Sequence, residues 1–166
     1  MVERFLAQTG FSSQEEFREP LHIRVPERFN FAYDVVDAYA AEQPDKKALL
    51  WTDDKDREIQ FTFADLKRES DRTASFFRSL GIGKGDPVML ILKRRYEFWF
   101  SMLALHKLGA VAIPATHLLT KKDVVYRCNM ASIKAIVVAG EKVITDHVAA
   151  AMPESPTVRA LVSVGP

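Results

Sequence analysis

The apolar and polar residues of this chain follow two alternating patterns. Short, predominantly apolar runs occur at 88–92, 110–113, 135–139 and 159–164. Between them, apolar residues recur every three to four positions, as on one face of a helix. Continuous apolar runs are typical of strands covered on both faces. Strands that alternate with helices predict a doubly wound, mostly parallel α/β sheet with helices on both faces.

Polar residues and glycines mark the ends of the intervening helices. Thr62 with Asp65 and Thr120 with Asp123 form capping patterns, in which a hydroxyl and a carboxylate satisfy free amides at a helix start. Gly81 is expected just beyond a helix end, where a left-handed backbone conformation is needed. We therefore predict helices over 62–80, 96–108, 120–130 and 141–152.

The first part of the chain has a less regular pattern. Residues 1–28 are polar and mixed, and we expect an irregular N-terminal extension there. A short helix should follow Ser12-Ser13, because Glu15-Glu16 supply a capping pattern. Pro20 and Pro26 interrupt any regular element after it.

A helix and a hairpin are predicted next. Tyr33, Val36 and Ala40 lie at helical spacing. Gln43-Pro44 ends that helix, since proline cannot continue it. Two strands, at 48–51 and 59–61, are joined by a charged turn and form a short hairpin ahead of the main sheet.

Composition and charge narrow the class of protein. The 166 residues carry a formal net charge of +1, with 48% hydrophobic and 27% charged residues, which is ordinary for a globular domain. A balanced charge gives no case for nucleic acid or an anionic membrane as partner. The apolar stretch at 96–108 contains Glu97 and Lys107 and is shorter than the ~20 residues of a membrane span. With Cys128 as the only cysteine and no signal-peptide pattern at the N-terminus, a cytoplasmic protein is expected.

The glycine-rich segment 81–85 has the wrong context for a phosphate loop. Phosphate binding needs the glycines after a strand and before a helix, so that backbone amides and the helix N-terminus meet the anion. Here the predicted order is helix first and strand second. A tight turn therefore explains this segment.

Catalytic and metal-binding patterns are also absent from the sequence. The four histidines, His22, His106, His117 and His147, are dispersed and have no metal-ligand spacing with Cys128. There is no Gly-x-Ser-x-Gly motif for a serine nucleophile. We assign no catalytic and no metal-binding residue in this chain.

The segment at 96–108 is apolar on nearly every side of the predicted helix. Such a helix is usually buried on several faces. Its apolar surface exceeds what one sheet can cover, so we expect exposed apolar area. Self-association through this helix or the final strand near Val164 is the expected consequence.

Five motifs, in order, resemble one family. They are Phe29–Val35, Phe61–Leu66, Gly85–Val88, His106–Pro114 and Asp123–Arg127. The chain resembles the N-terminal part of AMP-forming acyl-CoA synthetases of the adenylate-forming superfamily, and is most similar to the medium-chain group. Residues 29–166 would then be the first α/β portion of the large N-terminal domain of such an enzyme.

The resemblance implies an activity and its cofactors. Enzymes of this family join a carboxylic acid to AMP and then pass the acyl group to CoA, using ATP, Mg²⁺ and CoA. In the family, the phosphate loop, the adenine and magnesium residues and a C-terminal lysine come later than the position matched by Pro166. We therefore expect the 166 residues alone to be inactive and to bind none of these cofactors tightly. The preferred acyl chain stays open, because later residues build the acid pocket.

The resemblance also implies one candidate site. Thr116, His117, Leu118 and Leu119 match the segment that lines the passage for the pantetheine arm of CoA. A simpler interpretation is a loop that connects a strand to a capped helix.

A second function remains possible from the pattern alone: a stand-alone, flavodoxin-like binding or interaction module. Such modules place acidic or hydroxyl-rich loops after their strands. The predicted strand ends here are followed by Lys93-Arg94-Arg95 and Pro114-Ala115 instead. These loops favour the synthetase interpretation.

Overall fold

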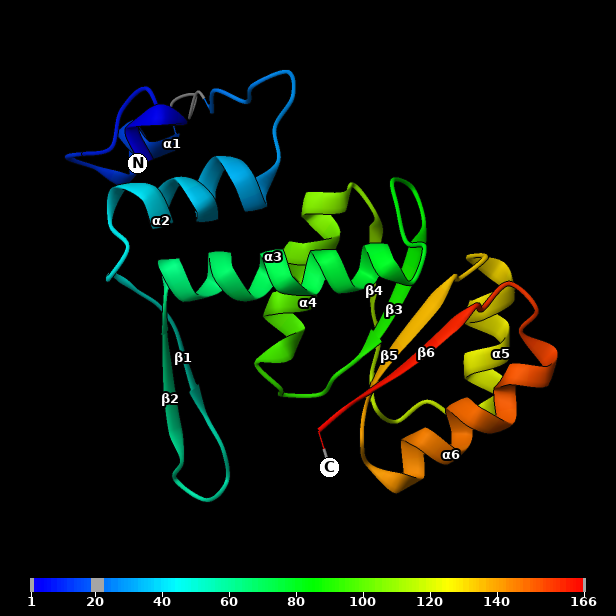
Figure 1. The fold of residues 1–166 in the computed structure, drawn as a ribbon. Coiled ribbons are helices and arrows are strands. Elements are labelled where there is room, and N and C mark those ends of the chain that lie inside the picture. Colours follow the sequence, from blue (N-terminus) through cyan, green and yellow to red (C-terminus); the bar gives the residue numbers. More distant parts are fainter. Residues whose placement is uncertain (1, 19–22, 166) are drawn as a thin grey trace.

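A computed structural model describes residues 2–18 and 23–165 (Figure 1). Its centre is a four-stranded sheet in the order β4-β3-β5-β6, in which every neighbouring pair is parallel. The strands are β3 (Pro87–Ile91), β4 (Val111–Pro114), β5 (Ala135–Ala139) and β6 (Ala160–Val164). The predicted doubly wound α/β fold is confirmed.

Helices cover both faces of the sheet because successive strand residues point to opposite sides. Val88 and Leu90 of β3 pack in the cluster that contains α3 (Phe63–Ser79) and α4 (Glu97–Leu108). Met89 and Ile91 of the same strand pack in the cluster with α5 (Lys121–Met130) and α6 (Lys142–Ala151). A short 3₁₀ helix, η3 (Met152–Glu154), follows α6. Both faces of β3 and β5 are thus buried, as their apolar runs predict.

The glycine-rich segment is a turn between α3 and β3, as predicted. Gly81 follows the helix end with a φ of 77°, and Gly85 precedes the strand with a φ of 82°. Both values lie in the left-handed region that favours glycine. The Gly83 amide donates to the Asp86 carboxylate at 3.0 Å. This segment therefore lies at the amino end of β3, where its glycines shape a turn.

Residues 32–62 of the N-terminal region pack against the helical layer of α3 and α4, and the elements before them lie farther from that layer (Figure 1). The N-terminal region comprises η1 (Val2–Arg4), α1 (Gln14–Arg18), η2 (Ala32–Asp37), α2 (Ala38–Glu42) and the antiparallel hairpin β1 (Lys47–Thr52) with β2 (Glu58–Thr62). The short helix after Ser13 and the hairpin are confirmed. The predicted interruption at Pro20 falls outside the described residues.

The helix predicted from Tyr33 onward differs from expectation in its winding. Residues Ala32–Asp37 form a π-helix, and only then does the α-helical winding of α2 begin. A π-turn contains more residues than an α-turn, so it changes which positions face inward. Ala32 and Val36 are buried, whereas Tyr33 is exposed.

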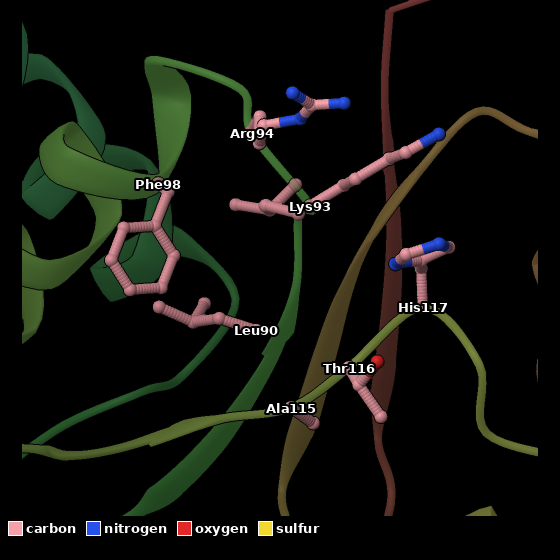
Figure 2. Close-up of a pocket in the computed structure, with 8 residues that line it drawn as sticks. Leu90, Lys93, Arg94, Phe98, Ala115, Thr116 and His117 are labelled. Atoms are coloured by element: carbon pink, nitrogen blue, oxygen red, sulfur yellow. The ribbon is translucent and has the colours of Figure 1, made fainter.

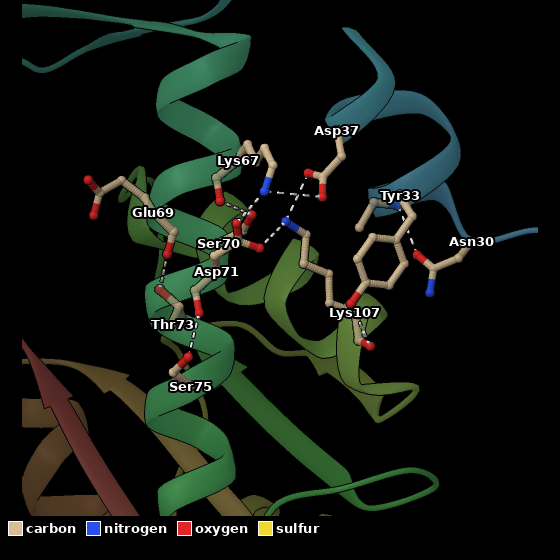
Figure 3. A network of polar contacts seen from close by, with 11 residues as sticks. Asn30, Tyr33, Asp37, Lys67, Glu69, Ser70, Asp71, Thr73, Ser75 and Lys107 are labelled. Carbon is tan, nitrogen blue, oxygen red and sulfur yellow. Dashed lines mark hydrogen bonds and ion pairs between the residues drawn. The ribbon is translucent and has the colours of Figure 1, made fainter. Parts of the chain in front are cut away.

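A buried lysine ties this segment to the helical layer (Figure 3). The ammonium of Lys107, at the end of α4, lies 2.8 Å from an oxygen of Asp37 and 2.7 Å from an oxygen of Asp71. Its side chain is only 2% exposed. Lys67 also contacts Asp71, at 2.6 Å. Two lysines and two aspartates from η2, α3 and α4 thus balance their charges.

The capping box of α3 provides a first testable prediction. The Thr62 hydroxyl accepts from the Asp65 amide, and the Asp65 carboxylate accepts from the Thr62 amide at 2.9 Å. Replacing Thr62 by alanine should lower the free energy of unfolding by about 1 kcal/mol, because a helix amide loses its acceptor. Urea unfolding followed by circular dichroism measures this loss.

The matched control is Ser75→Ala on the exposed face of the same helix. The Ser75 hydroxyl donates to the Asp71 carbonyl, an interaction that contributes little inside a helix. Its removal should change the unfolding free energy by less than about 0.5 kcal/mol. Equal losses in the two variants would contradict the capping role of Thr62.

Candidate site at the carboxyl ends of the strands

The topology defines where a ligand site is expected. From β3 the chain crosses to β4 on one side and then to β5 on the other side, so β3 and β5 flank a topological switch point. In open α/β sheets, ligands bind beyond the carboxyl ends of the strands near such a point. Two cavities lie in this region, and both include Lys93 and Arg94.

The larger cavity, of about 420 Å³, lies between the loop after β3 and the loop after β4 (Figure 2). Leu90, Leu92 and Phe98 give it an apolar side. Thr116 and His117 come from the loop after β4, and Lys93 and Arg94 from the loop after β3. The site thus combines an apolar wall with a few polar groups, which is the usual build of a small-molecule pocket.

The backbone at Lys93 is unusual. Its φ of 51° lies in the left-handed region although it carries a side chain. Such residues occur with low frequency, and they concentrate at turns and functional sites. The Lys93 ammonium reaches the Glu141 carboxylate, which lies just after the end of β5.

The three cations after β3 already have carboxylate partners. Lys93 pairs with Glu141 at 3.2 Å, across the switch point, and Arg94 lies 3.7 Å from Asp54. Arg95 pairs with Glu97 at 2.8 Å. The Arg94–Asp54 pair is weak, because the two side chains are 79% and 86% exposed. The apolar wall of the cavity suits the uncharged part of a ligand.

The sequence-predicted site residues separate into different environments. Thr116 and His117 line the cavity. Leu118 is 74% exposed, and its amide donates to the Thr116 hydroxyl at 3.3 Å. Leu119 is buried in the cluster between the sheet and α5 and α6. Their role toward CoA stays a prediction.

The sequence pattern does not indicate the other cavity residues. It places Leu90 in a strand, Lys93 in a loop and Phe98 in a helix. The available signal was their position: residues just after adjacent parallel strands share one edge of the sheet. Which of their side chains meet depends on the register of β3 and β4, where Leu90 lies beside Pro114.

The described residues include few side chains that could act as a nucleophile or bind a metal. Burial raises the pKa of the Cys128 thiol, and a hydrogen bond with Ser155 offsets this in part, so the thiol stays protonated at neutral pH. Within residues 2–18 and 23–165, no three His, Cys, Asp or Glu side chains converge as metal ligands would. The helices described in the structure are all too short or too polar to cross a bilayer.

Comparison with known protein families decides the identity of this α/β unit. The family model for AMP-binding enzymes matches residues 36–165. The chain belongs to the AMP-binding enzyme family.

Individual relatives agree with this assignment. The chain is 33% identical over 141 residues to the mitochondrial acyl-coenzyme A synthetase ACSM5 of Rattus norvegicus, covering 81% of this chain and 24% of the relative. It is 36% identical over 140 residues to the mitochondrial acyl-coenzyme A synthetase ACSM2A of Homo sapiens, covering 80% of this chain and 24% of the relative. This AMP-binding family member therefore spans about a quarter of the length of these relatives.

A solved structure shows the same fold. The N-terminal domain of FACL13 from Mycobacterium tuberculosis superposes with a TM-score of 0.72 at 24% identity, covering 82% of this chain and 34% of that one. The predicted resemblance to the N-terminal part of acyl-CoA synthetases, and to the medium-chain group in particular, is confirmed.

Proposed function

We propose that this chain is the N-terminal segment of an AMP-forming acyl-CoA synthetase. The whole enzyme would activate a carboxylic acid with ATP, releasing pyrophosphate, and then transfer the acyl group from acyl-AMP to CoA. The observation that carries the proposal is the cavity at the carboxyl ends of β3 and β4 in a chain of the AMP-binding family. The acyl-coenzyme A synthetase names of its relatives support the same activity.

Within this proposal, the cavity is part of the passage for the pantetheine arm of CoA. That arm is uncharged, with amides along a flexible chain. Leu90 and Phe98 offer apolar contact, and the Thr116 hydroxyl and the His117 ring offer hydrogen bonds.

The residues that the structure describes do not form a site for ATP or Mg²⁺. The described part has no cluster of carboxylates for a divalent cation, and its glycine-rich turn lies at the amino end of β3. We assign both to other segments of the enzyme. The 166 residues alone should then show no acid-dependent pyrophosphate exchange above a protein-free control.

The remaining features of the proposal concern organisation. Residues 1–28 would be an extension and 29–166 the first portion of the large N-terminal domain, which is supported by a family match that begins at residue 36. Trp99, which is half exposed, and Leu161 at the edge strand β6 support self-association of the isolated chain. A cytoplasmic location stays a prediction, because the relatives named above are mitochondrial.

Thr116→Trp in the complete enzyme tests the pantetheine passage. The indole should fill the cavity and obstruct CoA, while the acid and ATP sites, built by other segments, keep working. We expect CoA-dependent thioester formation to fall by about tenfold or more, with pyrophosphate exchange changed by less than about twofold. The two assays are run on the same preparation.

Val143→Trp is the control, because Val143 is exposed on α6 and lies outside the cavity. It should leave both half-reactions unchanged. Equal losses of the two half-reactions in Thr116→Trp, or no loss in either, would contradict a role in CoA passage. Complete absence of acid-dependent pyrophosphate exchange in the unsubstituted enzyme would favour the flavodoxin-like binding module instead.

A further inference from the structure

The segment that follows β3 forms one wall of the cavity at the carboxyl ends of β3 and β4. Lys93 and Arg94 lie in the loop after β3, and Phe98 lies in the first turn of α4 (Figure 2). The backbone of this wall is strained, because Lys93 has a left-handed φ of 51°. A strained conformation persists where contacts from the surrounding structure hold it. The shape of the wall therefore depends on what holds residues 93–98.

Trp51, on strand β1 of the hairpin, contacts this segment at two points. Its indole Nε1 donates a hydrogen bond to the main-chain carbonyl of Arg94, at 2.6 Å. Its ring also meets the ring of Tyr96 edge-on, with centroids 5.3 Å apart. A single side chain of the hairpin thus holds the residues on both sides of Arg95.

Tyr96 is in turn part of an aromatic cluster between the hairpin and α4. Its ring centroid lies 5.2 Å from that of Phe61 on β2 and 5.7 Å from that of Phe100 on α4. Phe61 and Phe100 also meet each other edge-on, at 5.2 Å. Aromatic pairs in such arrangements stabilise a fold beyond the area that they bury. The cluster gives Trp51 a firm base from which to hold the loop after β3.

We propose that Trp51 is a positioning residue for CoA, which keeps Lys93, Arg94 and Phe98 in the arrangement that admits the pantetheine arm. This inference rests on the proposed synthetase function and adds the hairpin to it. Trp51 is not one of the described residues that line the cavity, so it acts through the Arg94 carbonyl and the Tyr96 ring. When the loop is released, a smaller fraction of the molecules has the passage formed, and the apparent affinity for CoA falls by that fraction.

Trp51→Phe in the complete enzyme tests this role, because it removes the N–H donor and keeps an aromatic ring beside Tyr96. Loss of one neutral hydrogen bond shifts such an equilibrium about fivefold, so we expect the KM for CoA to rise about fivefold. The kcat of thioester formation should change by less than about twofold, since saturating CoA selects the formed passage. Acid-dependent pyrophosphate exchange should also stay within about twofold.

Two variants serve as controls. Trp99→Phe makes the same replacement at a half-exposed tryptophan whose ring contacts Phe98, with centroids 5.4 Å apart. It shows whether loss of any indole beside the wall is enough. Asp54→Asn removes the solvent-exposed carboxylate that pairs with the Arg94 side chain. Both controls should change the KM for CoA by less than about twofold.

Two further measurements separate positioning from a general effect on folding. Replacing Trp51 by 3-benzothienylalanine keeps both rings and exchanges only the N–H group for sulfur, so it should give the same rise in KM without disturbing the hairpin. Hydrogen exchange of residues 93–98, followed by mass spectrometry, reports on the loop without any assay of activity. We expect this exchange to be about fivefold faster in Trp51→Phe than in the unsubstituted enzyme.

An unchanged KM for CoA in the folded Trp51 variants would overturn the proposal, and so would equal losses of both half-reactions. An equal rise in Trp99→Phe, or unchanged hydrogen exchange of residues 93–98, would overturn it as well. Thr116→Trp, assayed in parallel, separates this failure from that of the proposed function. If only Thr116→Trp impairs the use of CoA, the positioning role alone is wrong. If neither substitution does, the proposed CoA passage is wrong as well.

Discussion

Replacing Phe77 by alanine should lower the free energy of unfolding by about 4 kcal/mol, the largest loss we expect from a single substitution here. Phe77 lies on the inner face of α3, is 1% exposed, and packs in the cluster with Val88, Leu90 and Ala104. Truncation removes its apolar contacts and leaves a cavity between helix and sheet. Equilibrium unfolding in urea measures the loss.

Phe76→Ala is a closely matched control, because it removes the same ring from the preceding residue. Phe76 is 45% exposed on the outer side of α3. Its removal should cost about 1 kcal/mol, because only about half of the ring is buried. Similar losses for the two variants would contradict the orientation of α3 described here.

The second large effect is expected for Lys107→Met. Methionine keeps much of the apolar stem but removes the ammonium that Asp37 and Asp71 share. Removing one partner of a buried ion pair is strongly destabilising, since the remaining charge stays desolvated. Because the Asp71 side chain is 44% exposed and Lys67 remains beside it, we expect a reduced loss of about 2 kcal/mol.

The pH dependence of this loss follows from Asp71. Desolvation acts to raise the pKa of its carboxyl, but hydrogen bonds from Lys107 and Lys67 outweigh it, so the pKa lies below the ordinary 3.8. A carboxyl whose pKa is lower in the folded than in the unfolded state stabilises the fold at pH values above its unfolded-state pKa. This stabilisation is lost as the pH falls through the folded-state pKa. The difference between wild type and Lys107→Met should therefore shrink on acidification below pH 3.8, as measured by urea unfolding at several pH values.

Lys142→Met is the control for the charge itself. Lys142 pairs with Asp146 one turn away on α6, and its side chain is 85% exposed. Such solvent-exposed pairs contribute little, so the variant should change stability by less than about 0.5 kcal/mol. A loss for Lys107→Met no greater than for this control would show that the buried network does not anchor η2 to α3 and α4.

The sequence by itself determined the sheet and most of its helices. Patterns of apolar residues are local, and the strands 88–92 and 135–139 are buried on both faces, so their runs are unbroken. The caps at Thr62 and Thr120 are also local, because the hydroxyl and the carboxylate that form them are three residues apart. The family resemblance was likewise readable, since it rests on short motifs in order.

Only the tertiary structure decided which side chains meet. His106 and Phe31 are distant in sequence, and their contact depends on how η2 packs against α4. No local sequence pattern indicates the π-helical winding of Ala32–Asp37. Its apolar positions resemble those of an α-helix, because π-winding shifts the inward-facing side chains by less than one turn. Thr116, Lys93 and Phe98 line one cavity because parallel strands end at the same edge of a sheet, whereas Leu119, three residues after Thr116, turns into the core. Sequence spacing fixes such positions along the chain, and packing between elements fixes their distances in space.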